Sequence, residues 1–413
     1  MFSLDLINTV AFGGVVLFAG HAIRRAITPL ARYNVPAPVI GGLLVATTLS
    51  VLRMRGVEIV TFDTQLQTPL MIAFFTTIGF GASLSLLRVG GPQVLVFALL
   101  CTVIAILQNV VGALVAAIVG RPALFGVLNG SVTLTGGPAT GLAFAPLFEA
   151  AGVNGAATVA VAAATVGIVS GGLIGGPIGT VLVSRLPRRS VHPAAAHAHV
   201  HPHVAQEIVE HQLHEARTGP APPGEGRQAH AILKALVVIM AAMWAGSWVS
   251  GQFQAMGVTL PAYIGAMLVA SVIRNLDDAT NIIGLSQQMI DDLGNVALSL
   301  FLVLALMTLR LWELAGLAGP MIVILIAQVV LIVAVCFWPV FQIMGRDYDA
   351  AVMTGGLCGF MLGTAANAMA NMDALTARYG AAPRAYLVVP MVGAFFIDFV
   401  NAVLITICLN IWT

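Results

Sequence analysis

Residues Thr354–Asn371 read TGGLCGFMLGTAANAMAN, and the interpretation of the whole chain starts from this stretch. It lies between two long apolar segments, is rich in glycine, and carries Thr364, Asn367 and Asn371 but no charge. Glycine disfavours a regular helix, and irregular backbone at membrane depth leaves N–H and C=O groups that need partners. We therefore predict a re-entrant hairpin that forms part of a binding site.

A second stretch of the same kind occurs in the first half of the chain. Asn129–Gly141 reads NGSVTLTGGPATG, again with glycines and hydroxyl groups, without charge and between apolar segments. Two such segments predict one shared binding site, because each would otherwise leave backbone groups without partners in the membrane.

Composition identifies the class of protein. The chain has 413 residues, of which 59% are hydrophobic and 8% are charged, whereas about 25% are charged in soluble domains. We therefore predict an integral membrane protein. A net charge of +1 argues against a nucleic-acid partner, and the four cysteines lie in apolar runs without metal-binding spacing.

The predicted fold is an all-α polytopic membrane protein built from two inverted repeats. Two hairpins, residues 122–148 and 350–372, follow the fourth and ninth spans, so each half has five spans and one hairpin. Pro36-Ala37 matches Pro261-Ala262, and Gly120-Arg121 matches Gly345-Arg346. A repeat with an odd number of spans inserts its second copy upside down. The ten spans, each of about 20 residues, are expected near residues 4–21, 36–52, 69–87, 93–119, 155–183, 231–251, 258–274, 293–309, 319–344 and 385–411.

These spans divide the chain into an N-terminal membrane repeat (1–183), a His-rich linker (184–230) and a C-terminal membrane repeat (231–413). With both termini outside, only Arg53, Arg55, Arg121 and Arg310 of the eighteen Lys and Arg residues fall outside, and the remaining fourteen fall inside. This bias predicts a cytoplasmic linker. The linker is either a solvated tether or, through Glu207, His211 and His214 at helical spacing, a metal-binding segment.

Polar residues within the predicted spans are the candidates for binding. Asp398 lies in the middle of the last span, where a carboxylate costs roughly 2.5 to 3.5 kcal/mol, and Asn401 follows one helical turn later. An ion ligand and a structural hydrogen-bonding partner are both open roles for Asp398. Gln108 and Asn109, in the fourth span, could belong to the site or join helices. Asp277, Asp278, Asp291 and Asp292 are expected to be solvated loop charges.

Four longer motifs resemble the sodium/glutamate symporters of bacterial inner membranes. They are PLMIAFFTTIGF from Pro69, GSVTLTGG from Gly130, LGNVALSLFL from Leu293 and YLVVPMVGAFFIDFVNA from Tyr386. The resemblance covers nearly the whole chain outside the linker. It implies Na⁺-coupled uptake of L-glutamate by a homodimer that works by alternating access with an elevator-like movement, and no cofactor beyond the coupling ion.

The resemblance implies that the two loops, with Asp398 and Asn401 beside the second, form the site, and the polar residues themselves add Thr140, Gln108 and Asn109. The expected substrate-binding residues are Ser131, Thr133, Thr135, Gly136, Gly137, Thr140, Gly355, Gly356, Gly359, Gly363, Thr364 and Asn367. The expected Na⁺ ligands are Gln108, Asn109, Asn371, Asp398 and Asn401. Two departures fall at the hairpin tips. The family usually has Gly-Gly-x-Gly where this chain has Gly136-Gly137-Pro138-Ala139, and a proline where this chain has Ala366. Aspartate or another small carboxylate therefore stays open as substrate, as does proton coupling.

Other function classes fit the residues less well. An intramembrane enzyme needs a catalytic set, and a lone Asp398 cannot form the paired carboxylates of an aspartic protease. A channel could use Gly-rich loops as a filter, but two loops entering from opposite sides suit alternating access better. The sequence therefore predicts a carrier and no enzyme.

Overall fold

The computed structural model describes residues 2–56, 60–85, 91–186, 226–256, 260–314 and 316–412, and these are almost entirely helical. A short parallel pair of strands, β1 (Phe2–Leu4) and β2 (Val60–Phe62), joins the start of the chain to the segment after α3. The helical elements of the first half are α1 (Leu6–Ala26), α2 (Thr28–Arg32), α3 (Ala37–Met54), α4 (Gln67–Gly81), α6 (Gly91–Ile118), α7 (Ala123–Val127), the π-turn η1 (Leu128–Val132), α8 (Gly137–Ala150) and α9 (Ala156–Ser184).

The second half also contains long helices and short ones. Its elements are α11 (Gly226–Ala255), α12 (Ala262–Thr280), α13 (Gln287–Met307), η3 (Leu311–Leu314), α14 (Ala318–Val335), η4 (Cys336–Val340), α15 (Phe341–Ile343), α16 (Tyr348–Met361), α17 (Ala365–Tyr379), α18 (Pro383–Met391), η5 (Val392–Phe396) and α19 (Ile397–Trp412).

Each of the ten predicted spans contains a helix, and seven helices in the described chain are long and apolar enough to cross a membrane. The helices at the other three predicted spans are too short, too polar or interrupted to be counted among these seven. Helix α4 has only 15 residues, α12 ends in a polar segment with Arg274, Asp277 and Asp278, and α18 is separated from α19 by the π-turn η5. A polytopic all-α membrane protein is therefore confirmed, whereas ten spans remain a prediction.

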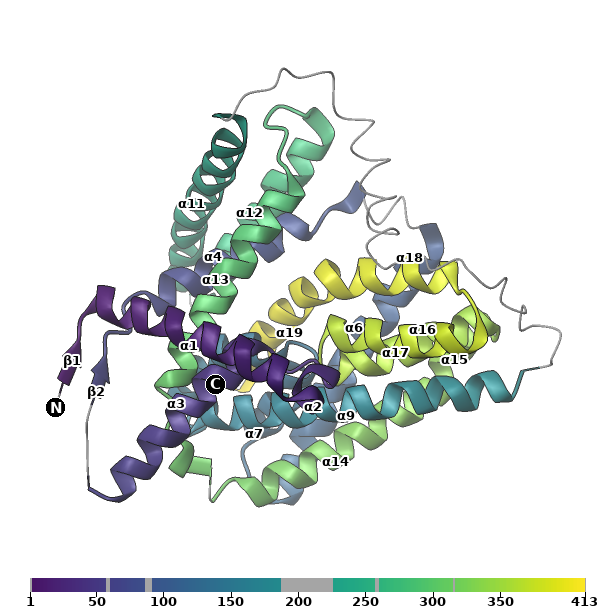
Figure 1. Ribbon diagram of the computed structural model, residues 1–413. Coiled ribbons are helices and arrows are strands. Elements are labelled where there is room, and N and C mark those ends of the chain that lie inside the picture. Colours follow the sequence, from purple (N-terminus) through teal and green to yellow (C-terminus); the bar gives the residue numbers. More distant parts are fainter. Residues whose placement is uncertain are drawn as a thin grey trace.

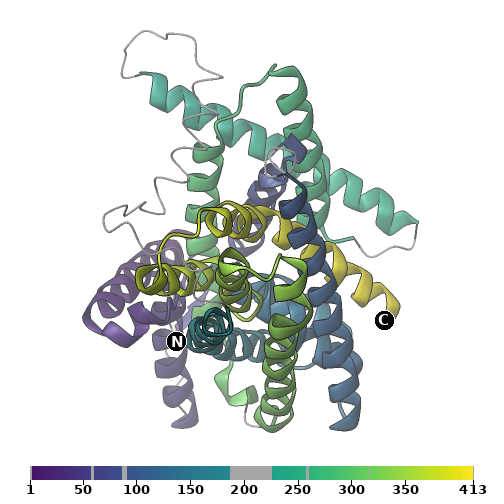
Figure 2. The ribbon, with the colours of Figure 1, turned by 90° about the vertical axis from the view of Figure 1, so that its right-hand side faces the viewer.

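The helices form two groups that pack mainly within themselves. The first group comprises α1, α3, α4, α11, α12 and α13, and the second comprises α6 to α9 and α14 to α19. In Figure 1, α11 and α12 lie at the upper left, and α16 to α18 extend to the right. Figure 2, turned by 90°, shows α1 and α19 ending on opposite sides of the molecule. Contact between the groups is made chiefly where α8 meets α13 and where α19 and η5 meet α4.

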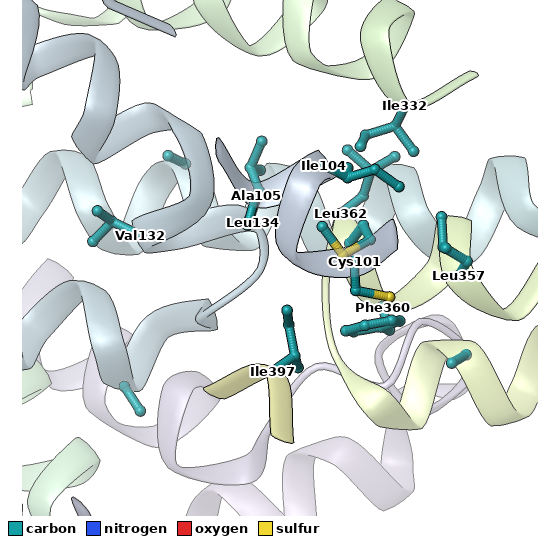
Figure 3. Close-up of a cluster of buried hydrophobic side chains, with 14 of the residues drawn as sticks. Cys101, Ile104, Ala105, Val132, Leu134, Ile332, Leu357, Phe360, Leu362 and Ile397 are labelled. Atoms are coloured by element: carbon teal, nitrogen blue, oxygen red, sulfur yellow. The ribbon is translucent and has the colours of Figure 1, made fainter. Parts of the chain in front are cut away.

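The largest buried core lies mainly in the second group, extends into α3, α4, α12 and α13 of the first, and joins both halves of the chain. Figure 3 shows Cys101 and Ile104 of α6 beside Leu134 of the first half and Leu357 and Phe360 of α16. These side chains are at most 3% exposed, so their burial supplies the hydrophobic driving force that holds the two halves together. The core thus includes side chains from both Gly-rich stretches, residues 129–141 and 354–371.

The connection after α12 corrects one expectation. Asp277 is 6% exposed, and its carboxylate accepts hydrogen bonds from the backbone N–H groups of Ile283, Gly284 and Leu285. Asp278 forms a buried ion pair with Arg274, with Nε and Oδ1 3.1 Å apart. The prediction of solvated loop charges was therefore wrong for both aspartates. The sequence could not reveal that residues 283–285 fold back onto the carboxylate of Asp277 and donate their backbone N–H groups to it.

The linker is described only at its two ends. Helix α9 ends at Ser184 and α11 begins at Gly226. Residues 187–225, with Glu207, His211 and His214, lie outside the described residues, so metal binding by the linker remains a prediction. Within the part of the chain that the structure describes, no three His, Cys, Asp or Glu side chains are grouped to hold a metal ion.

Candidate functional site

The first predicted hairpin is a helix, a break and a second helix. Helix α7 passes into the π-turn η1, where Gly130 has a non-helical backbone (φ −103°, ψ −128°). The chain then runs through Thr133 and Thr135 to Gly137, whose φ of +69° favours glycine, and α8 begins there. We call residues 128–136 the first break.

Glycine is required where the break approaches α6. A methyl group added at Gly130 would lie 2.9 Å from the Gln108 carbonyl oxygen and 3.0 Å from Asn109 Oδ1. The backbone N–H of Ser131 donates to Asn109 Oδ1 over 3.1 Å. Asn109 therefore satisfies a buried backbone donor that the break would otherwise leave unpaired.

The second break is shorter than the sequence predicted. The Gly-rich residues 354–361 are helical and belong to α16, and only Leu362, Gly363 and Thr364 interrupt the chain before α17. The prediction of a long irregular segment was wrong because the glycines serve packing. A methyl group at Gly171 of α9 would lie 2.8 Å from the Gly359 carbonyl oxygen. Removing Cβ atoms lets α9 and α16 approach closely, as small residues do between membrane helices.

The two breaks meet. A methyl group at Gly137 would lie 3.8 Å from the Gly363 carbonyl oxygen. The Gln108 side chain joins both breaks, because its Oε1 accepts from Thr135 Oγ1 over 2.6 Å and its Nε2 donates to the Met361 carbonyl over 2.8 Å. Gln108 and Asn109 thus lie at the predicted site and link helices at the same time.

Two helices begin where the breaks meet. Helix α8 starts at Gly137 with a proline in its first turn, and α17 starts after Thr364, whose hydroxyl accepts the backbone N–H of Asn367. The N-terminus of a helix carries partial positive charge and free N–H groups. The meeting point is therefore suited to an anion such as a carboxylate, although neither hairpin contains Lys or Arg.

The second break is tied to its surroundings by asparagine side chains. Asn367 Nδ2 donates to the Ile168 carbonyl of α9 over 2.7 Å, and Asn371 Nδ2 donates to the Gly171 carbonyl over 3.0 Å. Asn34, in the loop before α3, donates to Asn367 Oδ1 over 3.3 Å and to the Ala366 carbonyl over 3.4 Å. In this conformation Asn367 and Asn371 therefore hold α17 against α9.

The remaining predicted residues are near the breaks but differ in their surroundings. Thr133 donates to the Leu128 carbonyl within the first break, and the Thr140 side chain covers Gly136. Gly355 and Gly356 pack against Leu375 and Met372 of α17. Asp398 is half-buried on α19, one turn before Asn401, and Asn401 Nδ2 donates to the Ser131 carbonyl over 2.9 Å.

Sequence reasoning missed three polar residues of this region. Gln328 of α14 is fully buried and donates to the Gln108 carbonyl over 2.7 Å. Asn129 and Asn34 also went unnoticed. A buried glutamine in an apolar span was a usable signal for Gln328. The role of Asn34 had none, because it depends on a contact between residues 333 positions apart.

The comparisons with known proteins agree with one another. A family model described as Sodium/glutamate symporter matches residues 2–381. The chain is 38% identical over 412 residues to a protein of Escherichia coli K12 named Sodium/glutamate symporter, covering 99% of this chain and 98% of that protein. A protein of Haemophilus influenzae with the same name is 36% identical over 409 residues, which are 98% of this chain and 97% of the relative.

Proposed function

The chain belongs to the sodium/glutamate symporter family, and we propose that it carries L-glutamate into the cell by Na⁺-coupled symport. The observation that carries the proposal is the meeting of two helix N-termini, those of α8 and α17, at two breaks joined by Gln108. A carrier needs a solute site inside the membrane that is reachable from either side in turn. The protein performs no covalent chemistry and is not an enzyme.

Glutamate recognition is assigned to the two breaks. The N–H groups at the start of α8 and α17 bind carboxylate oxygens, supported by the hydroxyls of Thr140 and Thr364. The hydroxyls of Thr133 and Thr135 donate within the protein and hold the shape of the first break. Gly136, Gly137 and Gly363, which lie at the breaks, bring the backbone close to the solute, whereas Gly355, Gly356 and Gly359 pack α16 against α17 and α9. Because Pro138 removes one donor and Ala139 and Ala366 depart from the family pattern, aspartate and other small carboxylates are the alternative substrates.

Na⁺ is the proposed coupling ion. Neutral oxygens and one carboxylate suit a hard monovalent cation, and Gln108, Asn109, Asn371, Asp398 and Asn401 are the candidate ligands. Four of these five side chains already make hydrogen bonds to the segments around the breaks. Ion binding here would therefore act on the same backbone that binds the solute.

The proposed mechanism is alternating access by inverted repeats, with an elevator-like movement of the second helix group against the first. Two features support it. Pro36 and Pro261 precede α3 and α12 at matching places in the two halves, and each half has a broken hairpin after its fourth long helix. The sparse contact between the two groups is what relative movement requires.

We place the protein in the bacterial inner membrane as a homodimer, with both termini outside and the linker cytoplasmic. Side-chain contacts of three of the four arginines expected outside support their lying on one common side of the membrane, because each contact is made to a residue between 310 and 316. Arg53 lies over the Trp312 ring, Arg121 donates to the Gly316 carbonyl, and Arg310 pairs with Glu313. These arginines therefore lie at one end of the molecule.

Uptake by the purified protein in liposomes tests the function. We expect accumulation of labelled glutamate that saturates, requires an inward Na⁺ gradient and stops when choline replaces Na⁺. Competition by aspartate and other carboxylates will define the substrate range. Full uptake driven by a proton gradient without Na⁺ would exclude sodium coupling, and uptake that never saturates would favour a channel.

A further inference from the structure

Three side-chain oxygens at the first break have no hydrogen-bond donor among the described residues. They are Asn129 Oδ1, Ser131 Oγ and Asn401 Oδ1. Their residues are at most 1% exposed. A buried polar atom without a partner is costly, and native proteins rarely tolerate one without a reason. Three of them along one π-turn and the helix packed on it require a common explanation.

The hydrogen bonds around these oxygens fix which way both amides point. Asn129 Nδ2 donates to the Phe125 carbonyl over 2.8 Å, and Asn401 Nδ2 donates to the Ser131 carbonyl over 2.9 Å. Both nitrogens face carbonyl acceptors, so exchanging O and N in either amide would set two oxygens against each other. Each amide nitrogen therefore donates to a carbonyl while its oxygen faces no donor, and the Ser131 hydroxyl is engaged neither as donor nor as acceptor. A positively charged partner would satisfy lone pairs.

Two neighbouring amide oxygens differ from these three, whereas Gln328 Oε1 of α14 is buried and has no hydrogen-bond partner either. Asn109 Oδ1 accepts the Ser131 N–H, and Gln108 Oε1 accepts the Thr135 hydroxyl. These two oxygens, which the sequence suggested as ion ligands, are already engaged. The Ser131 hydroxyl, which the sequence suggested for substrate, is not engaged, and Asn129 was not suggested at all.

We propose that a Na⁺ ion binds between η1 and α19 with Asn129 Oδ1, Ser131 Oγ and Asn401 Oδ1 as protein ligands. The assignment rests on the proposed Na⁺-coupled transport. Neutral amide and hydroxyl oxygens favour a monovalent ion, whereas divalent ions are usually held by carboxylates. The Asp398 carboxyl, one turn before Asn401 on the same helix, is not required as a ligand.

The position of this ion would couple it to the solute. The Ser131 carbonyl accepts the N–H groups of Thr135 and Gly136 over 3.2 and 2.9 Å, and α8 begins at the next residue. An ion that orders Ser131 therefore orders the N-terminus of α8, where a carboxylate is expected to bind. Na⁺ should bind without glutamate and should increase the affinity for glutamate, as linkage between two sites requires.

The Ser131→Ala variant tests the site directly. Its hydroxyl is unpaired in the structure, so the variant loses no described hydrogen bond and should fold normally. We expect Na⁺ to raise the melting temperature of the wild-type protein without glutamate, and the variant to need at least about tenfold more Na⁺ for half of that effect. Thr406→Val is the matched control, because it removes a buried α19 hydroxyl that is bonded to the Ala402 carbonyl.

Further measurements distinguish a failure of this Na⁺ site from a failure of the proposed transport function. Asn129→Ala should shift the Na⁺ dependence in the same direction, and the double variant should be less than additive because both residues serve one ion. Unchanged Na⁺ dependence in Ser131→Ala, with Na⁺-driven uptake intact, would overturn the site and leave the proposed function standing. Equal stabilisation of the wild-type protein by choline chloride would also overturn it.

Discussion

At the scale of single residues, Asp277 is the clearest case of a charge that organises backbone. Burial raises its pKa, but the N–H groups of Leu285, Gly284 and Ile283 and the nearby Arg274 outweigh this and lower the pKa below its usual value. A lowered folded-state pKa contributes stability above the unfolded pKa, and this contribution is lost as the pH falls through the folded value. Asp277→Asn should cost about 2 kcal/mol at neutral pH.

The melting temperature of the detergent-purified Asp277→Asn protein measures this cost. Asp292→Asn, at an exposed position fifteen residues further on, is the control and should melt like the wild type. The difference between Asp277→Asn and the wild type should shrink as the pH is lowered below the usual range for aspartate. A difference that stays constant down to the lowest usable pH would show that the negative charge is not what stabilises the loop.

Asp398 poses a different question, because its role as an ion ligand remains a prediction. If its charge favours Na⁺ binding, Asp398→Asn should insert and fold, because the amide is similar in shape and cheaper to bury. The Na⁺ concentration for half-maximal uptake should then rise by about tenfold. A purely structural role would instead change the melting temperature and leave the Na⁺ dependence of uptake as it was.

At the scale of elements, the contact between α9 and α16 depends on glycine. A methyl group at Gly175 would lie 2.1 Å from Asn371 Nδ2 and 2.6 Å from the Gly355 carbonyl oxygen. Gly175→Ala should therefore destabilise the protein by about 1–3 kcal/mol through overpacking, and uptake should fall with it. Gly176→Ala is the control, since its nearest neighbour is 4.0 Å away. Equal melting temperatures for the two variants would disprove the close packing.

The elements also show what the sequence could and could not predict. Apolar length placed a helix in every expected span, because burial in lipid demands it. The glycine content led to a wrong prediction of irregular backbone where α16 forms. Glycine destabilises an isolated helix, but it allows close packing when another helix lies against it. The amides of Gln108 and Asn109 were recognisable as costly polar groups in a span. The free oxygens of Asn129 and Asn401 were not, because their lack of donors follows from three-dimensional contacts.

At the scale of the whole molecule, the two helix groups allow a test of movement. Asn34, in the loop before α3, lies against Ala366 at the start of α17, so one residue belongs beside the first group and the other to the second. Elevator-like transport requires the two groups to shift relative to each other. A short cross-link between Asn34→Cys and Ala366→Cys, in a protein without its native cysteines, should therefore abolish uptake.

Reduction of that cross-link should restore uptake, which separates loss of movement from loss of folding. The control pair is Gln254→Cys with Leu260→Cys, because Gln254 Nε2 donates to the Leu260 carbonyl over 3.3 Å within the first group. Cross-linking there should leave uptake nearly unchanged, since α11 and α12 pack closely on each other and are expected to move together. Undiminished uptake with the Asn34–Ala366 pair fully cross-linked would mean that the loop before α3 travels with α17, and the boundary between the moving groups would then have to lie elsewhere.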